Sequence, residues 1–412
     1  MKFAFAAQRL PNLSWSLLPI CMIALVIGFT GELVILGPNI ALERNAAAAW
    51  TIGSSTALQA CGIVASTPLA VYLLGRTGSA QVFAVGGSLC FCALAALLTS
   101  ETAIHIAIYR FVFAIGLGLL VVVSQHVVIA RAPAASKATT LAIFASFISI
   151  GSALVPACIR WAEADLALVY AGSLLGVVIA TLCAGSICRS GRAKAVAVWQ
   201  PWAMISRIGL RSFSSGIVYG VLTNGFCALL ANYAMRVGYS VADASTIVMA
   251  GLVGTFVLEI PLGWLCDRKK PSQVIGACAA ILIALLVLVL VMKPGWLVLL
   301  TLAFFVSGLV NAFYIVGLVE MTGMRPADLA SGTACFILAC GLGEMAGPLV
   351  GGFALEAFGS QGFVAVFLAI LIAYFAARTA ASSGRLSNLR ARTHPARPLP
   401  VPSQIIPAAA SS

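Results

Sequence analysis

Charged side chains are scarce in this chain. Of its 412 residues only 12 are Asp or Glu and three are His, and charged residues make up 9% of the total against 61% hydrophobic residues. A soluble domain normally has about a quarter of its residues charged. So few charges cannot cover the surface of a water-soluble globule, and we therefore expect most of the outer surface to contact lipid.

The same scarcity argues against catalysis and metal binding. The 12 cysteines include no Cys-x-x-Cys pair and no Cys/His cluster with zinc spacing. No Gly-x-x-x-x-Gly-Lys loop for a nucleotide is present. The net charge of +12 comes from Lys and Arg scattered between apolar runs, which differs from the gathered basic face of a nucleic-acid-binding protein. We expect no enzyme, no metal or other cofactor and no nucleic-acid partner.

Long apolar runs are abundant instead. A helix needs about 20 mostly apolar residues to cross the hydrocarbon core of a bilayer. Twelve such runs predict an all-α polytopic membrane protein: 14–36, 47–74, 80–99, 103–130, 138–159, 164–187, 212–236, 243–266, 274–292, 295–320, 328–354 and 361–381. They divide the chain into two six-helix bundles (1–187 and 212–381), a basic interfacial linker (188–211) and a disordered tail (382–412).

The positions of Lys and Arg orient these spans. Basic residues concentrate in cytoplasmic loops of membrane proteins. With the N-terminus inside, 19 of the 24 basic residues fall on the inner side and one, Arg110, lies within a span. The outer loops hold only Arg44, Arg160, Arg236 and Lys293. This asymmetry predicts a bacterial-type inner-membrane protein with both termini in the cytoplasm, and we expect it to be a monomer.

The two halves contain an internal repeat at a shift of 192 residues. Gly151 and Pro156 match Gly343 and Pro348, and Gly28 matches Gly220. Phe144 matches Phe336 and Arg76 matches Arg268 at the same shift. Each match alone is weak, but all of them share one shift. A parallel duplication predicts two pseudo-symmetric bundles with a binding site at their interface and movement by rocking of one bundle against the other.

These features resemble the major facilitator superfamily over residues 14–381. The loop Gly263-Trp-Leu-Cys-Asp267-Arg268 is similar to a family signature, and its counterpart has Gly75 where the family has Asp, before Arg76. Arg110 followed by Gly116 and Gly118 resembles the family's motif in the fourth span. Gly343-x-x-x-Gly-Pro-x-x-Gly-Gly matches a motif that antiporters of the family carry in the fifth span. In this chain the motif lies in the eleventh span. The surrounding sequence resembles the bacterial drug or sugar permeases.

Two candidate residues lie in spans that line the cavity in this superfamily. Glu32 follows Gly28 and Gly31 in the first span, and a carboxyl group inside a membrane persists where it lines a cavity or carries a proton. We expect it to couple transport to protons or to bind a cation, although a structural hydrogen bond is the alternative. Asn224 occupies the equivalent position in the seventh span and is suited either to ligand contact or to a hydrogen bond between helices.

Arg110 and Glu344 are the other intramembrane charges with a predicted role in transport or coupling. Arg110 stays protonated, and the resemblance implies that it binds an anionic substrate or controls proton release from a carboxylate, with a structural ion pair as the rival. Glu344 lies between Gly343 and Gly347, whose small size allows close helix packing but does not explain the acid. Gln59 and Asn311 are further candidates for lining the cavity.

Gating is the role that we expect for the remaining candidates. The resemblance implies that the loops after the second and eighth spans lock the halves together on the cytoplasmic side, and Gly75 weakens the first lock. Glu259 and Glu320 lie near the same side, where pairs with Arg76, Arg268 or Arg325 are plausible. The predicted gating set is Arg76, Asp267, Arg268, Glu259 and Glu320.

The leading hypothesis is therefore a secondary transporter of a small solute, coupled to protons and working by alternating access. Efflux of an amphipathic compound is favoured over uptake of a sugar, organic acid or siderophore. A receptor or scaffold of the same fold that does not transport is the alternative from another class, and it would move no solute under a pH gradient.

Overall fold

The computed structural model describes residues 18–100, 102–131, 137–162, 165–187, 201–292, 295–321 and 326–392. The first bundle consists of α1 Leu18–Arg44, α2 Ala49–Arg76, α3 Ser79–Leu98, α4 Ala103–Arg131, α5 Lys137–Trp161 and α6 Leu166–Ile187. The second bundle consists of α7 Pro201–Gly220, the π-helical turn η2 Val221–Cys227, α8 Leu230–Val237, α9 Val241–Arg268, α10 Pro271–Val291, α11 Trp296–Met321 and α12 Pro326–Arg392.

The described helices fit the predicted twelve crossings. Ten described segments are long and apolar enough to span a membrane, and Ser146–Trp161 of α5 is a shorter apolar helix. The span of α7, η2 and α8 is one crossing. Conversely, α12 contains two helices joined at Gly359, where φ is +66° and the chain turns back. Only a residue without a side chain adopts that conformation readily, so Gly359 separates the eleventh crossing from the twelfth.

The ends of the second bundle differ from the predicted boundaries. Helix α7 begins at Pro201, inside the predicted linker, and proline is well accommodated in the first turn of a helix. Helix α12 continues to Arg392, into the region predicted as a disordered tail. Residues 1–17 and 393–412, and residues 188–200 of the linker, lie outside the described residues.

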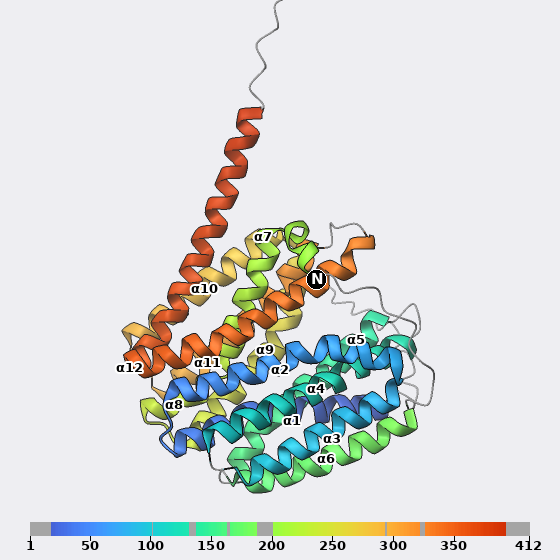
Figure 1. Cartoon of the computed structure of the whole chain (residues 1–412). Helices are drawn as coiled ribbons and strands as arrows, with labels where there is room; N and C mark the ends of the chain where they lie inside the picture. The colour runs from blue at the N-terminus through green and yellow to red at the C-terminus, as the bar shows by residue number, and fades with distance from the viewer. Residues whose placement is uncertain are drawn as a thin grey trace, which may run out of the picture.

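The two bundles are built alike, as the repeat predicts. Helix α1 packs on α5 as α7 packs on α12, α2 on α4 as α9 on α11, and α3 on α6 as α10 on α12. The bundles meet through α2 against α12 and α5 against α9, which are equivalent contacts when the halves are exchanged. Figure 1 shows the blue-to-green first bundle lying along the second, with α2 beside the orange part of α12.

Glycines allow the helices of each bundle to touch backbone to backbone. A Cβ atom at Gly28 would overlap the carbonyl oxygen of Ile148 on α5. At Gly220, it would overlap the carbonyl oxygen of Cys340 on α12, and these contacts are again 192 positions apart. Small residues at such crossings drive helix association in membranes, where the hydrophobic effect cannot. The repeated glycines are therefore packing positions that both halves retain.

The seventh crossing differs from the first at the π-helical turn η2. Before η2, equivalent residues are 192 positions apart, whereas beyond it Asn39 and Asn232 are 193 apart. The shift returns to 192 at the starts of α2 and α9, because the loop before α9 is one residue shorter. A π-helical turn holds one more residue than an α-helical turn, so η2 accommodates a residue that α1 does not have.

Substitution at these crossings gives a first prediction. We expect Gly28→Val and Gly220→Val each to lower the unfolding free energy by about 2 kcal/mol or more, since overpacking without room to relax costs about 1–3 kcal/mol. The measurement is the thermal denaturation midpoint of the purified protein in detergent. Gly276→Val on α10 is the matched control, because nothing lies within 4 Å of a Cβ atom there. Equal effects at the three positions would contradict the packing role.

Candidate functional site

A cavity of about 140 Å³ lies between the two bundles. The first bundle contributes Glu32 and Ile35 from α1, and all other described lining residues belong to the second bundle. These are Tyr219 of α7, Thr223, Asn224 and Cys227 of η2, Ala228, Leu230 of α8, Val248, Leu252 and Thr255 of α9, and Ser307 and Asn311 of α11. Three of the predicted residues therefore line one cavity: Glu32, Asn224 and Asn311.

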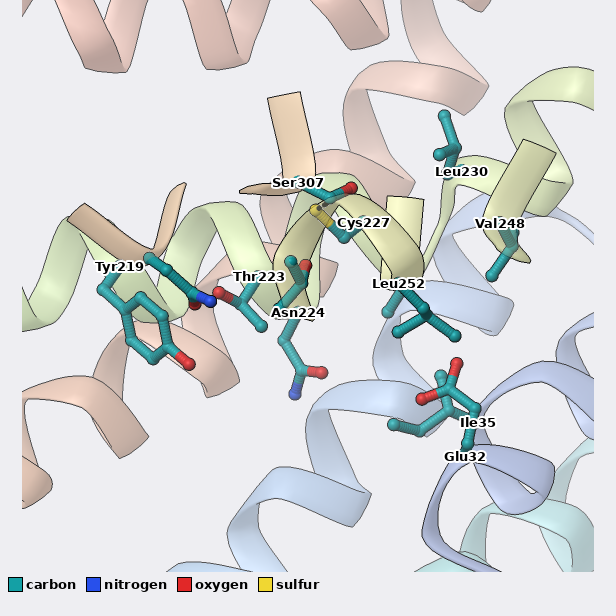
Figure 2. A pocket seen from close by; sticks show the side chains of 13 residues that line it. Glu32, Ile35, Tyr219, Thr223, Asn224, Cys227, Leu230, Val248, Leu252 and Ser307 are labelled. Atoms are coloured by element: carbon teal, nitrogen blue, oxygen red, sulfur yellow. Dashed lines mark hydrogen bonds between the residues drawn. The ribbon is translucent and has the colours of Figure 1, made fainter. Parts of the chain in front are cut away.

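The polar groups of the cavity lie on two opposite sides. Figure 2 shows the Glu32 carboxylate on α1 facing the side chains of η2 and α9, with the amide of Asn224 projecting from η2 into the same space. Asn224 donates from Nδ2 to the main-chain oxygen of Glu344 at 3.3 Å. Cys227 and Ser307 lie 3.5 Å apart, Sγ to Oγ. The Glu32 carboxylate has no hydrogen-bond or ion-pair partner among the described residues and is the one charged group in the described lining.

The π-helical turn determines which side chains of the seventh crossing enter this space. Its residues Thr223, Asn224 and Cys227 all line the cavity. Behind them, Gly225 packs directly on the main chain of Gly347 in α12, so the turn is held close to its neighbour. Such turns occur frequently at functional sites. The sequence repeat contains the signal for this extra residue, in the change of shift from 192 to 193, but not its location in a cavity wall.

Arg110 lies apart from the cavity, in the interior of the first bundle. Its side chain is fully buried. It donates from Nε to Gln59 Oε1 at 2.9 Å, and from Nη1 to Asn39 Oδ1 at 2.9 Å and Ser55 Oγ at 2.8 Å. These partners are neutral, and no described carboxylate lies within ion-pair distance. The two predicted residues Arg110 and Gln59 thus contact each other and join α1, α2 and α4.

One further contact links Arg110 to the cavity wall. Its Nη2 donates to the main-chain oxygen of Ile35 at 3.4 Å, and the Ile35 side chain lines the cavity. Arg110 therefore supports α1 from behind, one turn away from Glu32. The sequence did not identify Asn39 and Ser55, because a buried amide and a buried hydroxyl carry no distinctive pattern.

Three charged residues join the bundles at one end of the molecule. Arg236 Nε lies 2.7 Å from Glu43 Oε1, and Arg236 Nη1 lies 3.5 Å from Glu356 Oε2. The same Glu356 oxygen, Oε2, also accepts the main-chain N–H of Ala49 at 2.7 Å. We call Glu43, Arg236 and Glu356 the charge latch. It connects α1 and the start of α2 to α8 and the eleventh crossing, so this end is closed by contacts between halves.

The charge latch lies where the duplication brings equivalent positions together. Glu43 and Arg236 are 193 residues apart, the shift that applies beyond η2, and so are Asn39 and Asn232. Asn232 donates from Nδ2 to the Asn39 main-chain oxygen and to Glu43 Oε2, each at 3.0 Å. Equivalent residues in contact must lie near the pseudo-twofold axis, where identical charges would repel. An acid in one half and a base in the other makes this contact attractive.

The predicted gating side chains that the structure describes form no ion pair across the bundles. Glu320 pairs with Arg378 of α12, also within the second bundle, and accepts from Ser212 Oγ at 3.4 Å. Its partner is thus none of the three arginines that we considered. Arg76 and Arg268 are exposed and stack over Tyr72 and Trp264, at 4.5 Å and 4.1 Å from the ring centres. Glu259 is also exposed. The Asp267 side chain and Arg325 lie outside the described part of the chain.

Comparisons with known proteins agree with this architecture. Residues 210–404 match a family model described as Major Facilitator Superfamily. A search of curated proteins finds no significant relative. The fold is similar to that of the nucleoside transporter NupG (TM-score 0.73, 15% identity, covering 89% of this chain and 98% of that one).

Two other solved structures are similar over most of their length. A bacterial homologue of the human lysosomal transporter Spinster, inward-facing and unoccupied, gives a TM-score of 0.70 at 15% identity, covering 90% of this chain and 97% of that one. A D-xylose–proton symporter gives 0.68 at 14% identity, covering 87% and 96%. At these identities the likeness establishes the fold, which is the one that the sequence predicted.

The hydrogen bonds of Arg110 give a second prediction. We expect Arg110→Ala to lower the unfolding free energy by about 2–4 kcal/mol, because it removes the shared donor of buried acceptors on α1 and α2. Arg110→Lys should recover only part of the loss, since an ammonium group lacks the planar fork of the guanidinium. Thermal denaturation in detergent measures both, with the exposed Lys269→Ala as control. Full stability of Arg110→Ala would contradict this role.

Proposed function

We propose that the chain is a member of the major facilitator superfamily and works as a secondary transporter of a small solute. The observation that carries this proposal is the cavity between two pseudo-symmetric bundles, with one charged group in its described lining and contacts between halves at one end. The family match covers residues 210–404, and the repeat extends the same architecture to the first bundle.

Alternating access is the mechanism that this arrangement supports. A cavity between two rigid bundles becomes accessible from either side when one bundle rocks against the other. The charge latch would close the outer end, given the cytoplasmic placement of most Lys and Arg. Arg236 is 27% exposed, Glu43 11% and Glu356 42%. The exposed Arg236–Glu356 pair contributes roughly 0–1 kcal/mol, so this contact can break and form again as the bundles move.

Glu32 is the group that we assign to proton coupling. A carboxyl group within the membrane is costly unless it is paired or lines a water-filled space, and proton relays use such groups. Glu32 lines the cavity without a described partner, so its proton can be gained and lost as the cavity changes its exposure. Arg110 acts on it through α1, as a positioning residue. Efflux of an amphipathic compound into the medium outside a bacterial-type inner membrane is the direction we favour.

The role of Glu32 gives a third prediction. We expect Glu32→Gln to fold normally but to lose the stimulation of solute movement by an imposed pH gradient. The reason is that the amide cannot take up or release a proton. The measurement is uptake of fluorescent amphipathic amines into vesicles that contain the purified protein. Asp243→Asn, which changes a partly exposed carboxylate at the start of α9, away from the cavity lining, is the control. Retained stimulation in Glu32→Gln would remove this residue from coupling.

The charge latch gives a fourth prediction. Arg236→Gln removes both ion pairs, and we expect it to expose the cavity thiol of Cys227 to a membrane-impermeant maleimide added from the outer side. The same variant with Cys227→Ser gives the background from the other cysteines. Arg44→Gln, an exposed arginine at the same end, is the control. If Cys227 reacts no faster in Arg236→Gln than in the native protein, the latch does not hold this end closed.

A scaffold without transport remains the alternative from a different class. It predicts that no solute moves under any gradient, although the cavity binds ligands and the latch variants change thiol accessibility. The vesicle measurement therefore separates the two functions, because only a transporter gives accumulation that depends on the gradient.

A further inference from the structure

The cavity has a chemical asymmetry that bears on what it binds. Glu32 carries the one charge in the described lining, and it is negative. No Lys, Arg or His belongs to that lining, and the buried Arg110 directs its hydrogen bonds to Gln59, Asn39, Ser55 and the Ile35 main chain. A carboxylate or phosphate solute would lose its hydration there without meeting a positive group, which is expensive in a site of low dielectric constant.

The neutral part of the lining supplies both polar and apolar groups. Asn224, Asn311 and Ser307 supply amide and hydroxyl groups from η2 and α11. Ile35, Val248 and Leu252 supply an apolar surface from α1 and α9, and Figure 2 shows Leu252 next to Glu32. Binding sites for small molecules are commonly apolar with a few polar groups that fix orientation. A ligand that fits this lining has an apolar body and a polar substituent as well as its charge.

Resting on the proposed function, we propose that the cavity takes a small amphipathic solute with a single positive charge. Its ammonium group pairs with the Glu32 carboxylate, its apolar body lies against Val248 and Leu252, and its hydrogen-bonding substituent meets Asn224. Organic acids, which the sequence left open as substrates, are excluded by the negative charge of Glu32. A neutral sugar lacks the group that would use this carboxylate.

The π-helical turn supplies the specificity of this arrangement. It departs from the equivalent part of α1 by one additional residue, and it presents Thr223, Asn224 and Cys227 to the cavity opposite Glu32. The main chain of α12 fixes Asn224 through its bond to the Glu344 carbonyl oxygen. That bond leaves the amide oxygen as an acceptor for a hydroxyl group or an N–H of the solute.

Three probes of one skeleton test the charge preference: tyramine (an ammonium), tyrosol (a neutral alcohol) and 3-(4-hydroxyphenyl)propionate (a carboxylate). Binding to the purified protein is measured by calorimetry in detergent near pH 8, without any gradient. We expect tyramine to bind roughly ten- to hundredfold more tightly than tyrosol, as for a charge-assisted hydrogen bond, and the carboxylate to bind more weakly than either. Glu32→Gln should make tyramine and tyrosol equal.

Matched variants separate the charge from the polar side. Asn224→Ala should weaken tyramine and tyrosol by a similar factor and leave their ratio unchanged, whereas Asp243→Asn should change neither. Equal binding of the three probes in the native protein, a preference for the carboxylate, no binding of any probe, or a tyramine advantage that persists in Glu32→Gln would each overturn the proposal.

The same probes distinguish this inference from the proposed function. Tyramine that binds as expected but never accumulates in vesicles under a gradient would leave the charge preference intact and contradict transport. Transport of tyrosol or of the carboxylate in preference to tyramine would support transport and contradict the charge preference.

Discussion

A polar group inside the hydrocarbon layer must find its partner within the protein, and most of this structure follows from that constraint. Arg110 on α4 satisfies this constraint with neutral acceptors on α1 and α2, and its buried charge thereby joins three helices of the first bundle. Glu32 is an exception to this constraint: it faces a cavity and has no partner among the described residues. The contrast separates a group that stabilises the bundle from a group that is available to a solute or a proton.

Close packing is the second requirement, because lipid provides no hydrophobic drive for helices to associate. The duplicated glycines of α1, α5, α7 and α12 supply it by direct backbone contact. Two compact bundles result, and they meet through α2 against the eleventh crossing and through α5 against α9. Rocking of the bundles then disturbs few interactions within each one. The ion pairs of the charge latch suit a contact that must form and break, whereas the glycine crossings within each bundle suit one that must persist.

Departures from the duplication carry the functional features. An exact repeat would place like residues at the pseudo-twofold axis and an identical wall on both sides of the cavity. Glu43 against Arg236 replaces like charges by an ion pair. The extra residue in η2 gives the seventh crossing a different lining from α1, so one half supplies the carboxylate and the other the hydroxyl and amide groups. The duplication thus accounts for the arrangement of the helices. The departures from it account for the lining of the cavity and for the ion pair between the bundles.

The sequence by itself determined the class of protein, because apolar runs of bilayer length and the placement of Lys and Arg depend on solvation and on local composition. It also determined the duplication, whose matched glycines proved to be equivalent contacts, and it identified Glu32, Asn224 and Asn311. Only the tertiary structure decided that these three share a cavity and that Arg110 and Gln59 form a joint elsewhere. It also decided that Glu320 pairs with Arg378 and that Arg236 closes one end. The reason is physical. Whether a segment is stable in lipid depends on its own composition. The partner of a polar side chain depends on which helices pack together and on how each helix is rotated.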